Sequence, residues 1–216
     1  MNTPSSRPDA LLLMGKHCPY CPTVLQGLQA LKADGMIGKL ETVVIEDQPE
    51  RAAELGVRSV PWVRIGPFEL AGLRSEQELR SWAEKAGTEA GMAGYLDELL
   101  SSGNVDQGMA LVRDNPGTLH ALLLLLADPD TQLNTRIGIS VIMESLENSA
   151  RLQAIVDQLG ELARHAAASV RGDACHYLAL SGSSAALPYI KPLLEDEDAG
   201  VREIAAESLE QLKAGK

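Results

Sequence analysis

Two cysteines, Cys18 and Cys21, lie three residues apart in the sequence HCPYC, where an apolar run gives way to a helical pattern. The run over residues 9–14 is typical of a short buried strand, and apolar residues recur at helical spacing over residues 24–31. A close cysteine pair in a reducing compartment is more often catalytic or metal-binding than a structural disulfide. The position of the cysteine pair therefore predicts a fold in which a thiol site lies between a strand and the helix that follows it.

The first part of the chain alternates between strand and helix patterns. Strands are predicted over residues 9–14, 40–46, 60–66 and 67–72, and helices from Pro19 onward, over 48–57 and over 75–87. Ser75 and Glu78 have the spacing of a capping box, which predicts the start of the last helix. The predicted order is β-α-β-α-β-β-α.

The second part of the chain is helical and repetitive. Arg136, Arg171 and Arg202 each open a similar helix pattern, at spacings of 35 and 31 residues, and another amphipathic helix precedes each one. Two helices per repeat at such a period are typical of an α-solenoid, in which neighbouring repeats bury each other's apolar stripes. The small residues of AGTEAGMAG, over 86–94, predict a flexible linker. The expected domains are therefore residues 1–88 and 89–216.

Charge and hydropathy limit the partners of the chain. Residues 1–88 carry ten Lys and Arg against eleven Asp and Glu, whereas residues 89–216 carry nine against nineteen, within a net charge of −11. This acidic second part argues against nucleic acid or an anionic membrane as a partner. The longest apolar run, residues 121–127, is far shorter than the roughly 20 residues of a membrane span, and no signal peptide is visible. We therefore expect a cytoplasmic protein.

The cysteine pair suits disulfide exchange, which needs a thiolate. Pro19 is predicted to begin the helix, so that the helix dipole and unpaired N–H groups favour negative charge on Cys18. Lys16 and His17 add positive or protonatable groups that would lower the pKa of Cys18 further. Cys21, farther into the helix, is expected to be more buried and to resolve the mixed disulfide that Cys18 forms with a substrate.

The element order, the CPYC motif and the Val60-Pro61 pair about forty residues later together resemble the thioredoxin superfamily, in particular its small glutaredoxin-like members. The resemblance covers residues 9–87. It implies that Pro61 is a cis-proline facing the cysteines and that the Val60 backbone pairs with a substrate strand. Tyr20 is expected to shape access to Cys18. Residues 116–213 resemble HEAT-type repeats, which implies a helical solenoid that binds a protein.

The chain departs from the families that it resembles at positions that bear on its substrate. His17 and Leu12 stand where thioredoxins usually carry a tryptophan and an acidic residue. Of the glycine-rich turn that glutathione-binding glutaredoxins share, only Gly72 remains. We therefore expect a protein disulfide as the substrate, with electrons from a thiol donor and no tightly bound cofactor or metal ion.

Other interpretations of the pair remain open at this point. The cysteines could be an inert pair, a metal site completed by His17, or a metal or cluster site shared between two copies of the protein. Alternatively, the repeats are the functional part, a protein-binding scaffold whose redox domain is a fold module or a redox switch. Cys175, within a repeat helix, is expected to be a buried and unreactive thiol.

Overall fold

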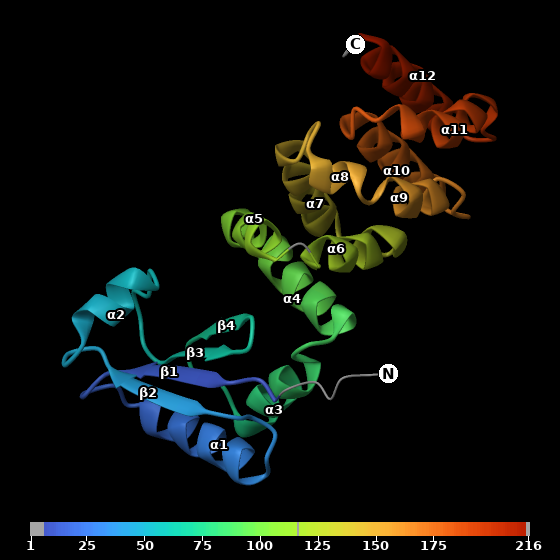
Figure 1. The fold of residues 1–216 in the computed structure, drawn as a ribbon. Coiled ribbons are helices and arrows are strands. Elements are labelled where there is room, and N and C mark those ends of the chain that lie inside the picture. Colours follow the sequence, from blue (N-terminus) through green and yellow to red (C-terminus); the bar gives the residue numbers. More distant parts are fainter. Residues whose placement is uncertain (1–6, 116, 215–216) are drawn as a thin grey trace. The chain divides into compact units, whose positions relative to one another are not determined.

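The computed structural model describes residues 7–115 and 117–214 (Figure 1). The chain divides into two compact units, Met1–Met92 and Ala93–Lys216. The division falls within helix α4 (Glu89–Ser101). The domain boundary that the sequence suggests, after residue 88, lies just before this helix and stays a prediction.

The first unit has the predicted order of strands and helices, β-α-β-α-β-β-α. Its strands are β1 (Ala10–Met14), β2 (Leu40–Val44), β3 (Trp62–Ile65) and β4 (Phe68–Ala71), and its helices are α1 (Cys21–Ala33), α2 (Pro49–Glu54) and α3 (Glu76–Lys85). The sheet order is β2-β1-β3-β4. Strand β1 runs parallel to β2 and antiparallel to β3, which in turn pairs antiparallel with β4.

Both faces of this sheet are covered, so the end of β1 is held firmly. Leu11 and Leu13 pack with Val43 and Trp62 in an apolar cluster that Ala52 of α2 and residues on either side of that helix complete. Leu12, which points to the opposite face because side chains alternate along a strand, is fully buried. Helices α1 and α3 pack against each other on that second face (Figure 1). The loop that leaves β1 therefore starts from a fixed position.

The cap of α3 confirms one prediction from the sequence. The Ser75 hydroxyl accepts a hydrogen bond from the Glu78 amide at 3.3 Å, and the Glu78 carboxylate accepts one from the Ser75 amide at 2.8 Å. This reciprocal pair is a capping box, and it fixes where the helix begins.

The segment 86–94, predicted as a flexible linker, is mostly helical, because α4 begins at Glu89. The Thr88 side chain caps the new helix by accepting a hydrogen bond from the Gly91 amide at 3.0 Å. A Cβ at Gly91 would come within 2.2 Å of the Lys85 carbonyl oxygen, so this position requires glycine for close approach. The small residues of this segment therefore permit tight packing and do not indicate flexibility.

The second unit is helical. After the end of α4 it contains α5 (Val105–Asp114), α6 (Thr118–Ala127), α7 (Leu133–Ser145), α8 (Ala150–Gln153), α9 (Val156–Leu162), α10 (Ala168–Leu180), η1 (Ser184–Ala186), α11 (Leu187–Ile190), η2 (Lys191–Glu195) and α12 (Ala199–Ala214). The stretches before α10 and α12, each predicted as one helix, are divided into shorter pieces. Pro188 and Pro192, which have no N–H to donate, account for the short pieces before α12.

The three repeat arginines, Arg136, Arg171 and Arg202, lie in α7, α10 and α12 and share one arrangement. Each donates to backbone carbonyl oxygens of the loop before its own helix, at 2.7 to 3.1 Å. The first two also pair with a carboxylate of the following repeat: Arg136 with Asp173 at 2.5 Å, and Arg171 with Asp196 at 2.7 Å. The arginines therefore tie each loop to its helix and each repeat to the next.

Within residues 7–115 and 117–214, no helix is long and apolar enough to cross a membrane.

Candidate functional site

The cysteine pair lies at the junction of β1 and α1, but the helix begins later than the sequence suggests. The first helical residue is Cys21, and Tyr20 is the N-cap. Pro22 occupies the first turn of the helix, where the missing N–H of a proline has no intrahelical partner to lose. Pro19, predicted to start the helix, lies in the bend before it. This arrangement leaves the Cys21 amide without a partner inside the helix.

That amide is directed at the other cysteine. The Cys21 N–H donates to the Cys18 Sγ at 3.1 Å, and the two residues form a disulfide with their Cα atoms 5.5 Å apart. Cys21 is fully buried, whereas Cys18 is half-buried. The Cys18 sulfur accepts a hydrogen bond from a backbone N–H and lies at the positive end of the helix dipole. Both interactions stabilise a thiolate once the disulfide is reduced.

Gly15 marks the point where three segments of the chain meet. A Cβ at this position would lie 3.2 Å from Val60 Cγ2, 3.2 Å from Glu46 Oε1 and 3.6 Å from Cys18 Cβ. The structure thus brings the predicted substrate-binding residue Val60 close to Cys18. The Val60–Pro61 peptide bond is cis, as the resemblance implies.

A second loop joins the site through Pro61. The Gly72 amide donates to the Pro61 carbonyl at 2.9 Å, and Gly72 has a φ of 83°, which favours glycine. Leu73 follows and is 51% exposed, and Tyr20, beside the cysteines in sequence, is 55% exposed. The loop that carries the cysteine pair and the loop that carries Gly72 thus each expose one large apolar or aromatic side chain.

Two carboxylates, Glu46 and Asp47, lie beside Lys16 in addition to the positive groups that the sequence predicts near Cys18. The Lys16 amide donates to both oxygens of the Glu46 carboxylate, at 3.0 and 3.2 Å. The Lys16 ammonium pairs with Asp47, whose hydrogen bond raises the pKa of Lys16. His17 is exposed. The two carboxylates, which follow β2, were missed by the sequence analysis because only the tertiary fold brings them beside the loop.

The third cysteine takes no part in this site. Cys175 is a free and fully buried thiol in α10, and its Sγ lies 3.7 Å from the Ser208 Oγ of α12. Its burial is as predicted from the sequence, and burial raises the pKa of Cys175, which favours the protonated thiol. No group of three or more His, Cys, Asp or Glu residues that could hold a metal ion is found in the described part of the chain.

Comparison with known proteins finds two family models, each of which matches part of the chain. The family model described as a thioredoxin domain matches residues 10–84, from the start of β1 into α3. The family model described as HEAT repeats matches residues 156–215, which begin at α9. No curated protein matches the chain. Taken with the sheet topology and the stacked helices, these matches show that the chain joins a thioredoxin-like domain to HEAT repeats.

Proposed function

We propose that the thioredoxin-like domain is a thiol-disulfide oxidoreductase that acts on protein disulfides. The observation that carries this proposal is the hydrogen bond from the Cys21 amide to the Cys18 Sγ, at 3.1 Å, where α1 begins. It supports Cys18 as the thiolate, and the half-buried position of Cys18 gives a substrate access to it. The buried position of Cys21 suits a resolving thiol.

The proposed exchange conserves atoms and electrons. The Cys18 thiolate attacks one sulfur of a substrate disulfide, so that a mixed disulfide forms and the other substrate sulfur leaves as a thiolate. Cys21 then loses its proton and attacks the Cys18 sulfur, which releases the second substrate thiolate. Two electrons have moved to the substrate, and the Cys18–Cys21 disulfide remains, which is the state in this structure. A thiol donor reduces the pair again.

The substrate chain is proposed to bind along the segment before β3. The Val60 backbone would pair with an extended substrate strand, and Pro61 and Tyr20 would border it. Val60 is close to Cys18 across Gly15, which supports this role. Lys16, His17 and Pro19 are proposed to modulate the pKa of the Cys18 thiol. The negative charges of Glu46 and Asp47 partly offset the positive charge of Lys16.

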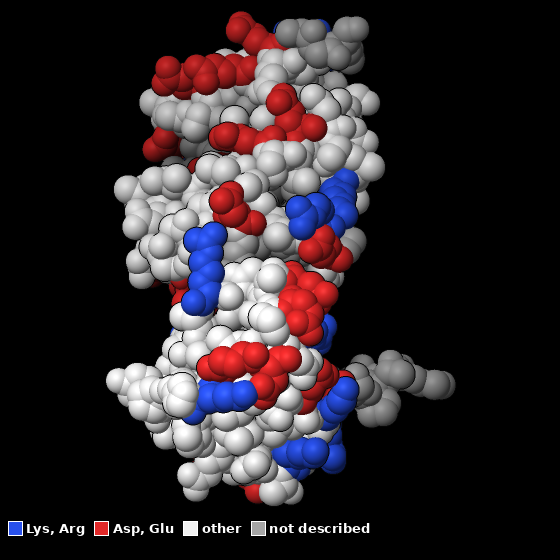
Figure 2. Space-filling model, turned by 90° about the vertical axis from the view of Figure 1, so that its left-hand side faces the viewer, with Lys and Arg blue, Asp and Glu red and all other residues white. Residues whose placement is uncertain are grey.

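The HEAT repeats are proposed to dock a protein client or partner, which would raise the local concentration of its cysteines at the thioredoxin-like domain. The unit is acidic: residues 93–216 carry nine Lys and Arg against eighteen Asp and Glu. Acidic side chains are spread over the face of this unit that Figure 2 shows. A cytoplasmic location fits a dithiol that needs a reducing donor, and it remains part of the proposal.

Turnover of a disulfide-bonded model protein, with dithiothreitol as the donor, tests the activity. We expect Cys18→Ser to lower the rate to that of dithiothreitol alone, because the attacking sulfur is lost. Cys21→Ser should accumulate a mixed disulfide between Cys18 and the substrate, visible by mass spectrometry and released by excess reductant. Cys175→Ala is the matched control, and it should keep full activity.

The same variants separate this proposal from a scaffold. If the wild-type protein has no activity above the dithiothreitol background and Cys21→Ser traps nothing, the oxidoreductase proposal is wrong. The scaffold interpretation then predicts that the double variant Cys18→Ser with Cys21→Ser retains every partner that the wild-type protein binds.

A further inference from the structure

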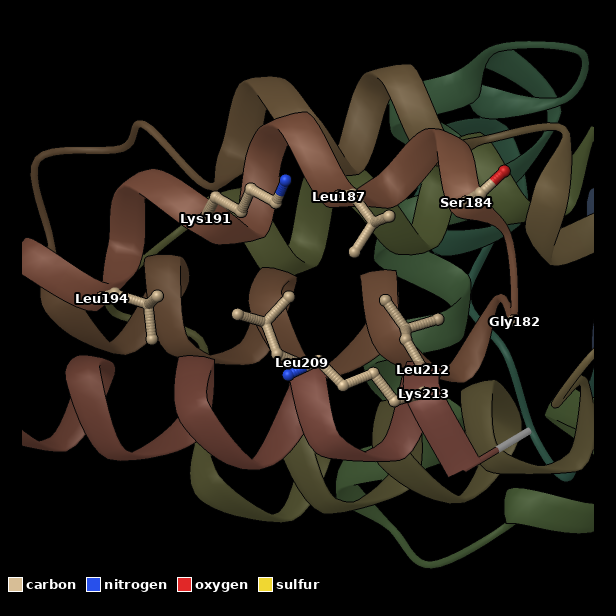
Figure 3. Close-up of a pocket in the computed structure, with 8 residues that line it drawn as sticks. All are labelled: Gly182, Ser184, Leu187, Lys191, Leu194, Leu209, Leu212 and Lys213. Carbon is tan, nitrogen blue, oxygen red and sulfur yellow. The ribbon is translucent and has the colours of Figure 1, made fainter. Parts of the chain in front are cut away.

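The last repeat contains an apolar groove of about 480 Å³. One wall is formed by α11 and η2 and the other by α12. Figure 3 shows Leu187 and Leu194 on the first wall and Leu209 and Leu212 on the second, with their side chains directed between the walls. Leu194 is 37% exposed, so part of this apolar surface faces water. Gly182 and Ser184 close one end.

Two lysines, Lys191 and Lys213, line the same groove, one on each wall (Figure 3). Among the described residues that line the groove, none is acidic. Residues 93–216 contain only one further lysine, Lys216, which lies outside the described residues. The described lysines of this acidic unit are therefore gathered at one apolar groove.

The arginines of the unit are used differently. Each of the six donates to a carboxylate or a backbone carbonyl of the protein, namely Arg113, Arg136, Arg151, Arg164, Arg171 and Arg202. Among the contacts of residues 93–214, by contrast, neither Lys191 nor Lys213 forms an ion pair or a side-chain hydrogen bond. The two ammonium groups are thus available to pair with a carboxylate of another molecule, and both lysines border an apolar surface.

We propose that this groove binds an acidic amphipathic helix of a partner protein. Its apolar face would fill the space between the four leucines, and its Asp or Glu residues would pair with Lys191 and Lys213. Insertion of an amphipathic helix into an apolar groove is a recurring mode of recognition, and the leucines and lysines match its two faces. The groove thereby gives a location and a chemistry to the docking role proposed above, and it does not depend on thiol exchange.

Electrostatics makes the proposal specific. The protein carries a net charge of −11, so its overall field attracts a basic helix and repels an acidic one. An acidic helix can therefore bind more tightly than a basic one only where local positive charge outweighs that field. Lys191 and Lys213 provide such local positive charge, and the preference for an acidic helix should weaken as salt screens it.

The test uses two fluorescein-labelled helical peptides with the same leucine face, one flanked by glutamates and the other by lysines. We expect the full-length protein to bind the glutamate peptide more tightly, as measured by fluorescence anisotropy. The double variant Lys191→Glu with Lys213→Glu should bind that peptide about tenfold more weakly and prefer the lysine peptide. The control Lys32→Glu with Lys39→Glu makes the same change of net charge in the other unit and should keep the original preference.

Two further variants separate the contribution of the apolar surface of the groove from that of the cysteine pair. Leu194→Ser removes apolar surface at a partly exposed position, so it should weaken both peptides while circular dichroism shows an unchanged fold. The double variant Cys18→Ser with Cys21→Ser should bind the glutamate peptide like the wild type, even if the oxidoreductase proposal fails. A preference of the wild type for the lysine peptide, no binding of the glutamate peptide, or equal binding by the Lys191→Glu and Lys213→Glu double variant would each overturn the inference.

Discussion

At the scale of single residues, Glu46 lies closer to the thiol site than its sequence position suggests. It lies just beyond β2, yet its carboxylate accepts the Lys16 amide on the loop that carries Cys18. A Cβ at Gly15 would be 3.2 Å from Glu46 Oε1 and 3.6 Å from Cys18 Cβ, so the carboxylate and the cysteine are neighbours across this glycine. Glu46 therefore holds the loop and places negative charge near the proposed nucleophile.

The two effects of Glu46 can be separated by substitution. Glu46→Gln keeps an oxygen for the Lys16 amide but removes the charge that opposes a thiolate. We expect it to raise the rate of Cys18 alkylation in the reduced protein at pH 6 about twofold to threefold. Glu46→Ala removes the hydrogen bond as well and should also slow turnover of the model disulfide, because the loop loses its anchor.

Iodoacetamide labelling, followed by mass spectrometry across a pH series, measures this effect. Glu84→Gln, which removes an equivalent exposed charge on α3, should leave the labelling rate unchanged. Labelling of Cys18 that is equal or slower in Glu46→Gln would show that the charge of Glu46 does not act on the thiol.

At the scale of secondary structure, the Arg171–Asp196 pair connects α10 to the loop that precedes α12. Both side chains are only 8% exposed, and two hydrogen bonds, of 2.8 and 2.7 Å, join the guanidinium to the two carboxylate oxygens. Arg171 also donates to two carbonyl oxygens before its own helix. Because a buried charge without its partner is costly, this pair should be sensitive to the loss of either member.

Asp196→Asn should therefore destabilise the helical unit by on the order of 3 kcal/mol at pH 7. The hydrogen bond from Arg171 lowers the pKa of Asp196 below its ordinary value of 3.8. A lowered pKa in the folded state contributes stability above the ordinary pKa, and that stability is lost as the pH falls toward the folded-state pKa. The difference in stability between the wild type and the variant should thus be largest near neutral pH and should shrink as the pH falls below 3.8.

Urea unfolding followed by circular dichroism between pH 7 and pH 2 provides the measurement. Glu203→Gln, an exposed position on α12, serves as a control for the loss of one charge. A difference between wild type and Asp196→Asn that does not shrink toward low pH would contradict the assigned role of the pair.

Patterns within an element are the part of the structure that the sequence predicts well. The Ser75 and Glu78 spacing predicts the start of α3, and the capping box is present. The first turn of α1 is different, because Pro19 and Pro22 are both acceptable near a helix start and only the packed loop selects Pro22. The Thr88 cap of α4 is not predicted from the sequence, because the small residues around Thr88 favour a linker over a helix start.

At the scale of the whole molecule, the two units carry different spectroscopic reporters. Trp62 and Trp82, the two tryptophans of the chain, both lie in the first unit, where they are buried. Most of the helices lie in the second unit. Tryptophan fluorescence therefore reports on the thioredoxin-like domain, whereas far-ultraviolet circular dichroism reports mainly on the repeats.

The division into two units predicts unfolding transitions that do not coincide. In urea, the midpoint measured by tryptophan fluorescence should differ from that measured by circular dichroism. Asp196→Asn should lower the circular dichroism midpoint and leave the fluorescence midpoint in place. Coincident transitions that shift together in this variant would show that the chain unfolds as one cooperative unit.

The local features of this protein can be predicted from its sequence alone, namely the strand and helix periodicities, the repeat of arginines, and a cysteine pair between a strand and a helix. These depend on residues that are neighbours along the chain. Contacts between distant groups depend on the tertiary structure. Glu46 and Val60 approach Cys18 only after the sheet has formed. Lys191 and Lys213 face one groove only after α12 has packed. Contacts of this kind depend on packing between elements, which periodicity and spacing do not encode.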